Sequence, residues 1–135
     1  MELSEYVCGV IQDAVKQSER ISRSDMIAAT FAADGWEKAF KRAYRVRSFK
    51  PAPVNETLIE SLAEWLGEAP AKEAADALIA RLGAPVAVFR AEKEDAFLCA
   101  LSSSHRRFGA FYTTEDAFFV LFGTHAIAFL MGNFD

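Results

Sequence analysis

The most apolar segment of the chain lies at its C-terminal end, and it constrains the fold more than any other feature. Residues 118–131 contain no Asp, Glu, Lys or Arg, and apolar residues occupy odd and even positions alike. A strand with one face in water alternates apolar and polar residues, because successive side chains point to opposite faces of the sheet. We therefore expect two strands here, residues 117–122 and 126–131, that are covered on both faces. The second cover is either another part of the chain, such as its first helix, or a second subunit, which would make a homodimer through the apolar sheet.

Three further strands are predicted before this pair, at residues 86–91, 96–101 and 107–112. Each is a short apolar run, and the polar breaks between the runs are short enough for hairpins. Parallel neighbours would need a long crossover connection. The second half of the chain therefore predicts an antiparallel meander of about five strands over residues 86–131.

The first half has a different period, because apolar residues recur at helical spacing as far as Gly83. This spacing predicts about five helices, at residues 3–15, 26–31, 36–44, 58–66 and 70–82. Asn55 is the expected N-cap of the fourth helix. Residues 48–53 carry two prolines and are expected to be a linker. The fold class is therefore α+β, with a helical half (residues 3–83) packed on the meander, in a single domain of residues 1–135.

The overall charge, the cysteines and the N-terminal residues indicate in which cellular compartment the protein is expected. The formal net charge is −4, and the two cysteines, Cys8 and Cys99, lie in apolar patterns. We expect both to be buried free thiols. Acidic residues near the N-terminus do not fit a signal peptide, and no apolar stretch reaches the length of a membrane span. We therefore expect a cytoplasmic protein with no contact to a membrane.

The densest positive charge lies at residues 38–50, which contain no acid. Basic residues interleaved with aromatic ones can bind a nucleic-acid backbone. A solvated helix face and an acidic protein partner are the alternatives. A helix-turn-helix match is weak, because Phe31 and Lys41 stand where the motif wants small and aliphatic residues. The candidate anion-binding residues are Lys38, Lys41, Arg42, Arg45 and Arg47.

Negative charge recurs every four residues along the predicted fourth helix. Side chains at this spacing share one stripe, and like charges at i, i+4 repel each other slightly. The stripe is either solvated, paired with the basic helix of the same chain, or the contact surface for a basic protein. Its members are Glu56, Glu60, Glu64 and Glu68.

Catalytic signatures are sparse. A polar turn at residues 102–107 could hold a phosphate or a carboxylate, through Ser104, His105, Arg106 and Arg107. The spacing of His and Cys does not fit a metal site, and no nucleotide-binding or nucleophile motif is present. We expect no cofactor and no metal, and we expect that the protein is not an enzyme.

A small acidic chain without a catalytic motif has the general character of the inhibitor and immunity proteins with which bacteria neutralise toxins. The leading hypothesis is therefore a non-enzymatic binding protein that masks a basic protein partner through the glutamate stripe. Nucleic-acid binding through the basic helix is the second hypothesis. A small enzyme or ligand-binding domain that uses the loop at residues 102–107 is the third.

Overall fold

A computed structural model of the chain describes residues 2–21, 25–44, 49–91 and 113–133, and its centre is a five-stranded antiparallel sheet. The strand order across the sheet is β1-β5-β4-β3-β2. The strands are β1 Met26–Ala32, β2 Pro51–Val54, β3 Ala87–Ala91, β4 Thr113–Leu121 and β5 His125–Asn133. The helices are α1 Leu3–Gln17, α2 Trp36–Ala43, α3 Leu58–Leu66 and α4 Glu68–Leu82. The α+β class is confirmed, but the described part of the chain has four helices and not about five.

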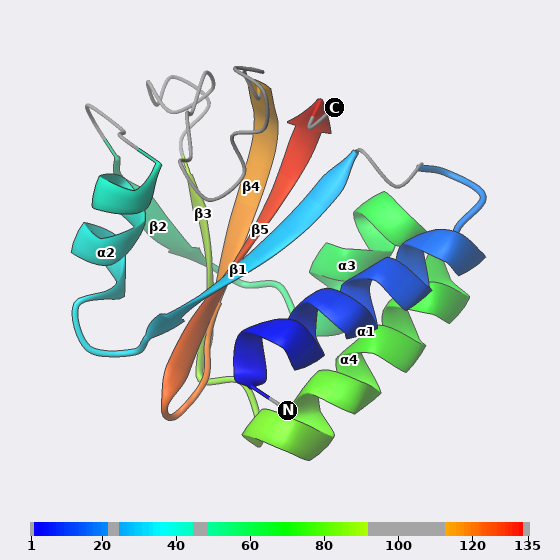
Figure 1. Ribbon diagram of the computed structural model, residues 1–135, viewed down its shortest axis with the longest axis horizontal. Coiled ribbons are helices and arrows are strands. Elements are labelled where there is room, and N and C mark those ends of the chain that lie inside the picture. Colours follow the sequence, from blue (N-terminus) through cyan, green and yellow to red (C-terminus); the bar gives the residue numbers. More distant parts are fainter. Residues whose placement is uncertain (1, 22–24, 45–48, 92–112, 134–135) are drawn as a thin grey trace.

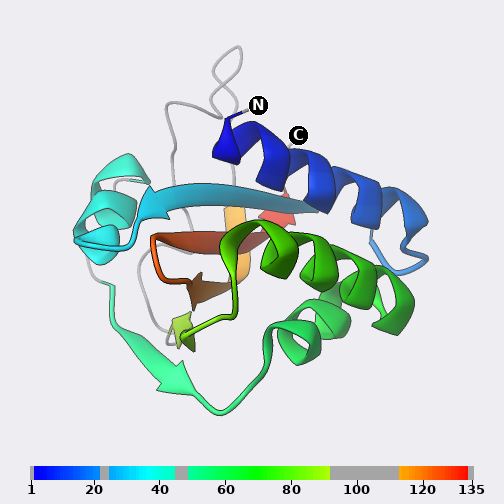
Figure 2. The ribbon, with the colours of Figure 1, turned by 90° about the horizontal axis from the view of Figure 1, so that it is seen from below.

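Helices cover both faces of the sheet (Figures 1 and 2). The helices α1, α3 and α4 form a layer on one face, and α2 lies alone on the other. Each layer buries its own apolar cluster against the sheet. Within the three-helix layer, the Tyr6 hydroxyl donates to the Ala77 carbonyl at 3.0 Å, which ties α1 to α4. The Ser18 hydroxyl donates to the Leu66 carbonyl at 2.8 Å and ties the end of α1 to α3.

The apolar C-terminal segment forms the two central strands, as its pattern predicts. On one side of β4 and β5, Phe118 and Phe129 stack at 4.7 Å in the cluster beneath the three-helix layer. On the other side, Phe119 and Leu130 belong to the cluster beneath α2. The chain thus supplies the second cover itself, through α2 and not through its first helix. A homodimer is not needed to bury these strands and remains a prediction.

The predicted second helix is wrong, because residues 26–32 form the edge strand β1. This strand pairs along its whole length with β5, from Met26 opposite Met131 to Ala32 opposite His125. The segment consists of Met, Ile, Ala, Thr and Phe, so its composition fits a buried helix or a strand about equally well. The long-range pairing with β5 decides in favour of the strand. It also removes the helix-turn-helix arrangement, which needs a helix before Gly35.

The predicted linker is partly a strand, and the predicted N-cap of the fourth helix is wrong. Pro51 and Pro53 belong to β2, which pairs antiparallel with β3 at the edge of the sheet, where proline is tolerated. The helix after it, α3, is capped by Thr57 and not by Asn55. The Thr57 hydroxyl accepts from the Glu60 N–H at 3.0 Å, and Glu60 accepts from the Thr57 N–H at 3.3 Å, which completes a capping box.

Three of the predicted meander strands correspond to β3, β4 and β5, but β3 pairs directly with β4, whereas the meander placed two further strands between them. The two outer strands, β1 and β2, come from the first half of the chain, so the sheet is not purely C-terminal. The predicted strands at residues 96–101 and 107–112 lie outside the described residues. Among the helices that the structure describes, none is long and apolar enough to cross a membrane.

Candidate functional site

The most elaborate polar site in the described part of the chain is centred on Arg90 of β3. Its guanidinium contacts three carboxylates that come from three different segments. Arg90 Nε lies 3.0 Å from Glu56 Oε2, before α3. Arg90 Nη2 lies 2.7 Å from Glu64 Oε2 on α3, and Nη1 lies 3.4 Å from Asp116 Oδ2 on β4. We call these four residues the Arg90 cluster.

The position of Arg90 in the sheet explains why it needs these partners. It lies two residues after Val88 on β3 and therefore faces the three-helix layer, at the margin of the core. Its register partner is Phe118, and the guanidinium carbon lies 5.5 Å from the centre of that ring. Only 18% of the Arg90 side chain is exposed. A charge placed there has lost much of its water, and the carboxylates replace that solvation.

A further polar residue, Ser61 of α3, is hydrogen-bonded to the cluster, and its side chain is fully buried. Its hydroxyl donates to Glu56 Oε2 at 2.8 Å, the same oxygen that accepts from Arg90 Nε. With Thr57 as N-cap, Glu56 is the residue before the cap and Ser61 is the fourth residue of the helix. In many helices, apolar residues at these two positions contact each other and form a hydrophobic staple. An N-cap at Asn55 would instead place such a staple between Val54 and Ile59. Here a polar bond between Glu56 and Ser61 makes the connection.

These contacts shift the pKa values of Glu56 and Arg90. Burial by itself would raise the pKa of Glu56, but the hydrogen bonds from Ser61 and Arg90 and the positive charge of Arg90 outweigh it and hold this pKa below its usual range. Burial would lower the pKa of Arg90, whereas the bond and the charge of Glu56, followed by Asp116 and Glu64, raise it. One guanidinium against three carboxylates leaves the cluster with a negative surplus.

The four glutamates of the stripe predicted from the four-residue spacing have different structural roles. Glu56 precedes the helix and is held by Ser61 and Arg90. Glu60 belongs to the capping box, while Glu64 pairs with Arg90 and is 59% exposed. Glu68 begins α4, beyond the break at Gly67, whose φ of 91° favours glycine. For Glu56 and Glu64 the partner is Arg90 of β3, whereas the basic helix α2 lies on the other face of the sheet.

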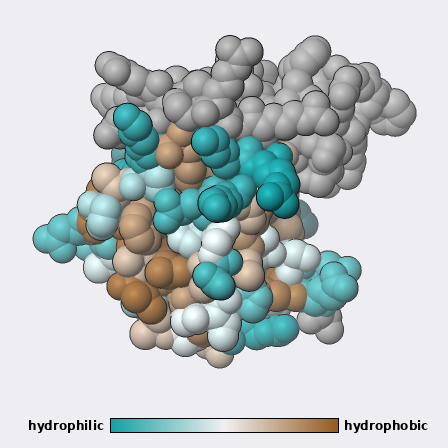
Figure 3. Space-filling model, turned by 90° about the vertical axis from the view of Figure 1, so that its left-hand side faces the viewer, coloured by the Kyte–Doolittle hydropathy of each residue, from teal (hydrophilic) through white to brown (hydrophobic). Residues whose placement is uncertain are grey.

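The basic residues described on α2, which are Lys38, Lys41 and Arg42, are exposed. They lie on the opposite side of the sheet from the Arg90 cluster (Figure 1). The aromatic residues of this segment, Trp36, Phe40 and Tyr44, are buried beneath α2, so they cannot stack on nucleic-acid bases. Figure 3 shows the side of the molecule on which α2 lies. Hydrophilic residues gather in the upper part of the coloured surface, and hydrophobic residues are visible in its lower part. Arg45 and Arg47 lie outside the described residues.

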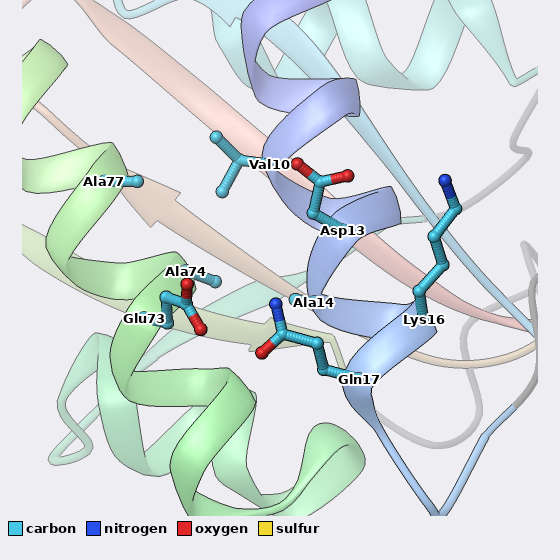
Figure 4. A pocket seen from close by; sticks show the side chains of 8 residues that line it. All are labelled: Val10, Asp13, Ala14, Lys16, Gln17, Glu73, Ala74 and Ala77. Atoms are coloured by element: carbon cyan, nitrogen blue, oxygen red, sulfur yellow. The ribbon is translucent and has the colours of Figure 1, made fainter.

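A groove of about 380 Å³ runs between α1 and α4 (Figure 4). Its floor is apolar and includes Val10, Ala14 and Ala74, and its rim is polar. On the rim, Glu73 and Gln17 point toward one another across the groove, whereas Lys16 points away. The rim therefore carries charges of both signs and no convergent set of polar groups. This groove offers a hydrophobic contact but no evident chemistry.

The remaining sequence candidates contribute little to a site. Ser104, His105, Arg106 and Arg107 lie outside the described residues, as does Cys99. Cys8 is a free thiol and is exposed, in contrast to the prediction. Its Sγ nevertheless turns toward β1 and donates to the Ala28 carbonyl at 3.6 Å, and partial burial raises its pKa.

Sequence reasoning missed Arg90, Ser61 and Asp116. The available signal was Arg90 itself, which is the single charged residue of the predicted strand 86–91. A charge on a strand of a well-covered sheet requires partners. In the described ranges, no group of three or more His, Cys, Asp or Glu residues is arranged to hold a metal ion.

Comparison with known proteins adds no assignment to this geometry. The chain matches no protein-family model. It also matches no curated protein and no solved structure.

Proposed function

We propose that this protein is a non-enzymatic binding protein that contacts a basic region of a protein partner through an acidic surface formed by Glu56, Glu60 and Glu64. The observation that carries the proposal is the Arg90 cluster. It holds Glu56 and Glu64 in place and still leaves a surplus of negative charge at the surface. Carboxylates that are fixed before binding lose little side-chain entropy when a partner arrives.

Glu68 is set apart from the other three glutamates of the predicted stripe. Arg20 lies at the C-terminal end of α3, where its guanidinium donates to the carbonyls of Ala63 and Glu64 at 3.2 and 3.3 Å. This positive charge offsets the negative charge beside Gly67 and Glu68. The acidic surface therefore extends along α3 from Glu56 to Glu64 and does not include Glu68. Masking a basic protein, as an inhibitor or immunity protein masks a toxin, is the role that such a surface would serve.

The test is the double charge reversal Glu60→Lys and Glu64→Lys. Partners are captured from a nuclease-treated lysate with the wild-type chain, identified by mass spectrometry, and titrated by calorimetry. We expect the double variant to bind at least about tenfold more weakly, because like charges across an interface repel. The matched control is Glu5→Lys with Asp13→Lys, two exposed positions on α1 with the same change in charge. Equal affinities of the two double variants would exclude this surface as the interface.

Nucleic-acid binding through Lys38, Lys41 and Arg42 is the second candidate. The exposure of these residues on a face away from the acidic surface supports it, and the burial of the neighbouring aromatic rings counts against it. It predicts a gel shift with DNA or RNA at low salt that disappears as salt is raised. An unchanged mobility across the titration would remove it.

A further inference from the structure

A second groove lies next to the acidic surface, at the end of the sheet where β2 turns into α3 and α4 turns into β3. Its volume is about 410 Å³, and its apolar wall includes Pro53, Val54, Pro85 and Val86. Val86 is 66% exposed, which is the largest exposure of any large hydrophobic residue among those described. Exposed aliphatic side chains that line a concave surface are typical of contact sites for other proteins. We call this feature the Val86 groove.

The charge on the Val86 groove is negative. Glu56 is the one charged residue of its lining, in which the described residues include no Lys or Arg. The carboxylate of Glu60 lies 3.3 Å from the backbone nitrogen of Thr57, which is also part of the lining. A hydrophobic side chain that enters the groove therefore comes close to two carboxylates. A cation beside that side chain would be attracted to them.

The walls of the groove are held by contacts on both sides. Val54 pairs with Val88 in the sheet, and the Val86 N–H donates to the Leu121 carbonyl at 2.7 Å. On the α3 side, the capping box fixes Thr57, and Ser61 with Arg90 fixes Glu56. A groove that is already formed requires little ordering when it binds.

We propose that the Val86 groove receives an aliphatic or aromatic side chain from a protein partner, supplied by a segment in which the neighbouring residues are Lys or Arg. Glu56 and Glu60 would attract the Lys or Arg residues of the partner segment. The exposed apolar wall at Val86 would contact its aliphatic or aromatic side chain. The proposal rests on the proposed function, and it adds the kind of segment that the acidic surface recognises.

A second copy of this chain does not fit the groove through its own basic helix. The basic segment with aromatic residues is α2, but Trp36, Phe40 and Tyr44 are buried against the sheet. Their removal from the core would expose large aromatic surfaces, which is unfavourable. Among the described residues, α2 therefore offers no accessible apolar anchor to a second copy. The proposed occupant is a partner protein whose apolar residue is already accessible.

The experiment uses the full chain with methyl groups labelled for NMR and short synthetic peptides as probes. One peptide has Leu between lysines, one has Ala between lysines, and one has Leu between glutamates. We expect the Leu–Lys peptide to shift the methyl signals of Val54 and Val86 and to leave Val10, in the α1–α4 groove, unchanged. The Ala–Lys peptide should bind about tenfold more weakly, because its central side chain buries less apolar area. Val86→Ser should abolish the difference between these two peptides.

The outcomes separate this proposal from the proposed function. Equal binding of the Leu–Lys and Ala–Lys peptides, or shifts at Val10 without shifts at Val86, would overturn the groove as the anchor site. Neither result bears on the acidic surface. Equal binding of the Leu–Lys and Leu–Glu peptides would contradict both the preference for a basic segment and the role of the acidic surface in binding. A lack of shifts with every peptide at about millimolar concentration would reject the Val86 groove, while the charge-reversal titration would still decide the proposed function.

Discussion

Arg90 shows how one residue can determine the character of a surface. It lies at the margin of the core, so its charge needs compensation, and the compensation comes from residues far apart in the sequence. The i, i+4 repulsion expected between Glu60 and Glu64 is relieved because these residues have different partners. Glu60 bonds the backbone of Thr57, and Glu64 bonds Arg90. The spacing of the glutamates in the sequence therefore reflects local structural needs as much as a stripe for binding.

Glu56→Gln should reduce stability near neutral pH and change how stability depends on pH. The pKa of Glu56 is lowered from 4.5 in the folded protein, so the carboxylate stabilises the fold above that pH. This contribution is lost as pH falls through the lower, folded pKa. We expect the free energy of unfolding to fall by about 1 kcal/mol near pH 7, a modest loss because the carboxylate is partly exposed. The difference from wild type should be smaller at acidic pH. Urea unfolding from about pH 7 down to about pH 3 measures this.

The control for this variant is Asp76→Asn on α4. Asp76 pairs with Lys72 at 3.3 Å, but the two side chains are 61% and 71% exposed. Exposed pairs of this kind contribute little, so we expect a change within about 0.5 kcal/mol at neutral pH. If the stability of Glu56→Gln ran parallel to that of wild type across the whole pH range, the Arg90 cluster would have no role in the pH dependence.

At the scale of single elements, the start of α3 is where the local sequence allows two N-caps and the structure uses one. Asn55 and Thr57 are both good N-cap residues. The structure selects Thr57, because Glu60 three residues later can return a hydrogen bond to its backbone N–H. A cap at Thr57 also places Glu56 and Ser61 on either side of the helix start, where both reach Arg90 or its partner oxygen.

Thr57→Ala should destabilise the protein by about 1 kcal/mol, because the Glu60 N–H loses its acceptor at the first turn of α3. Asn55→Ala should change stability by less than about 0.5 kcal/mol, because its side chain does not cap the helix. Chemical denaturation of both variants measures the difference. A larger loss for Asn55→Ala than for Thr57→Ala would place the cap at Asn55.

At the scale of the whole molecule, charge is divided between the two sides of the sheet. The acidic surface belongs to the three-helix layer, and Lys38, Lys41 and Arg42 belong to α2 on the other face. The sheet separates these groups, so they do not neutralise one another within the chain. The two binding hypotheses can therefore be tested by variants on opposite faces of the sheet, and we expect the effects of these variants to be independent.

The second face of the sheet depends on α2, and in particular on Phe40. This ring is fully buried and lies 4.9 Å from Phe119 and 4.8 Å from Phe49 between ring centres. Phe40→Ala should cost about 3–5 kcal/mol, since it leaves a cavity over the central strands. Phe31→Ala, at a half-buried ring 6.0 Å from Phe40, should cost less. Thermal unfolding measures both, and similar losses would show that α2 is not the main cover of this face.

The sequence by itself determined the elements whose pattern allows one interpretation. The stripe of α1 predicts a helix, as do the stripes of α3 and α4, because apolar residues recur at 3.6-residue spacing and glycines end α3 and α4. The two-sided apolar pattern of β4 and β5, divided by a short turn, predicts strands in the interior of the sheet, because a strand covered on both faces needs no alternating polar positions. Local patterning is sufficient in these cases.

Only the tertiary structure decided the rest, because the deciding interactions join residues distant in sequence. The segment Met26–Ala32 is a strand because β5 offers it a full ladder of partners. The prolines of β2 are accommodated because that strand lies at an edge. The Arg90 cluster exists because the sheet brings β3 and β4 to the start of α3. Local sequence specifies which conformations a segment can adopt, and long-range contacts select among them wherever the local preference is weak.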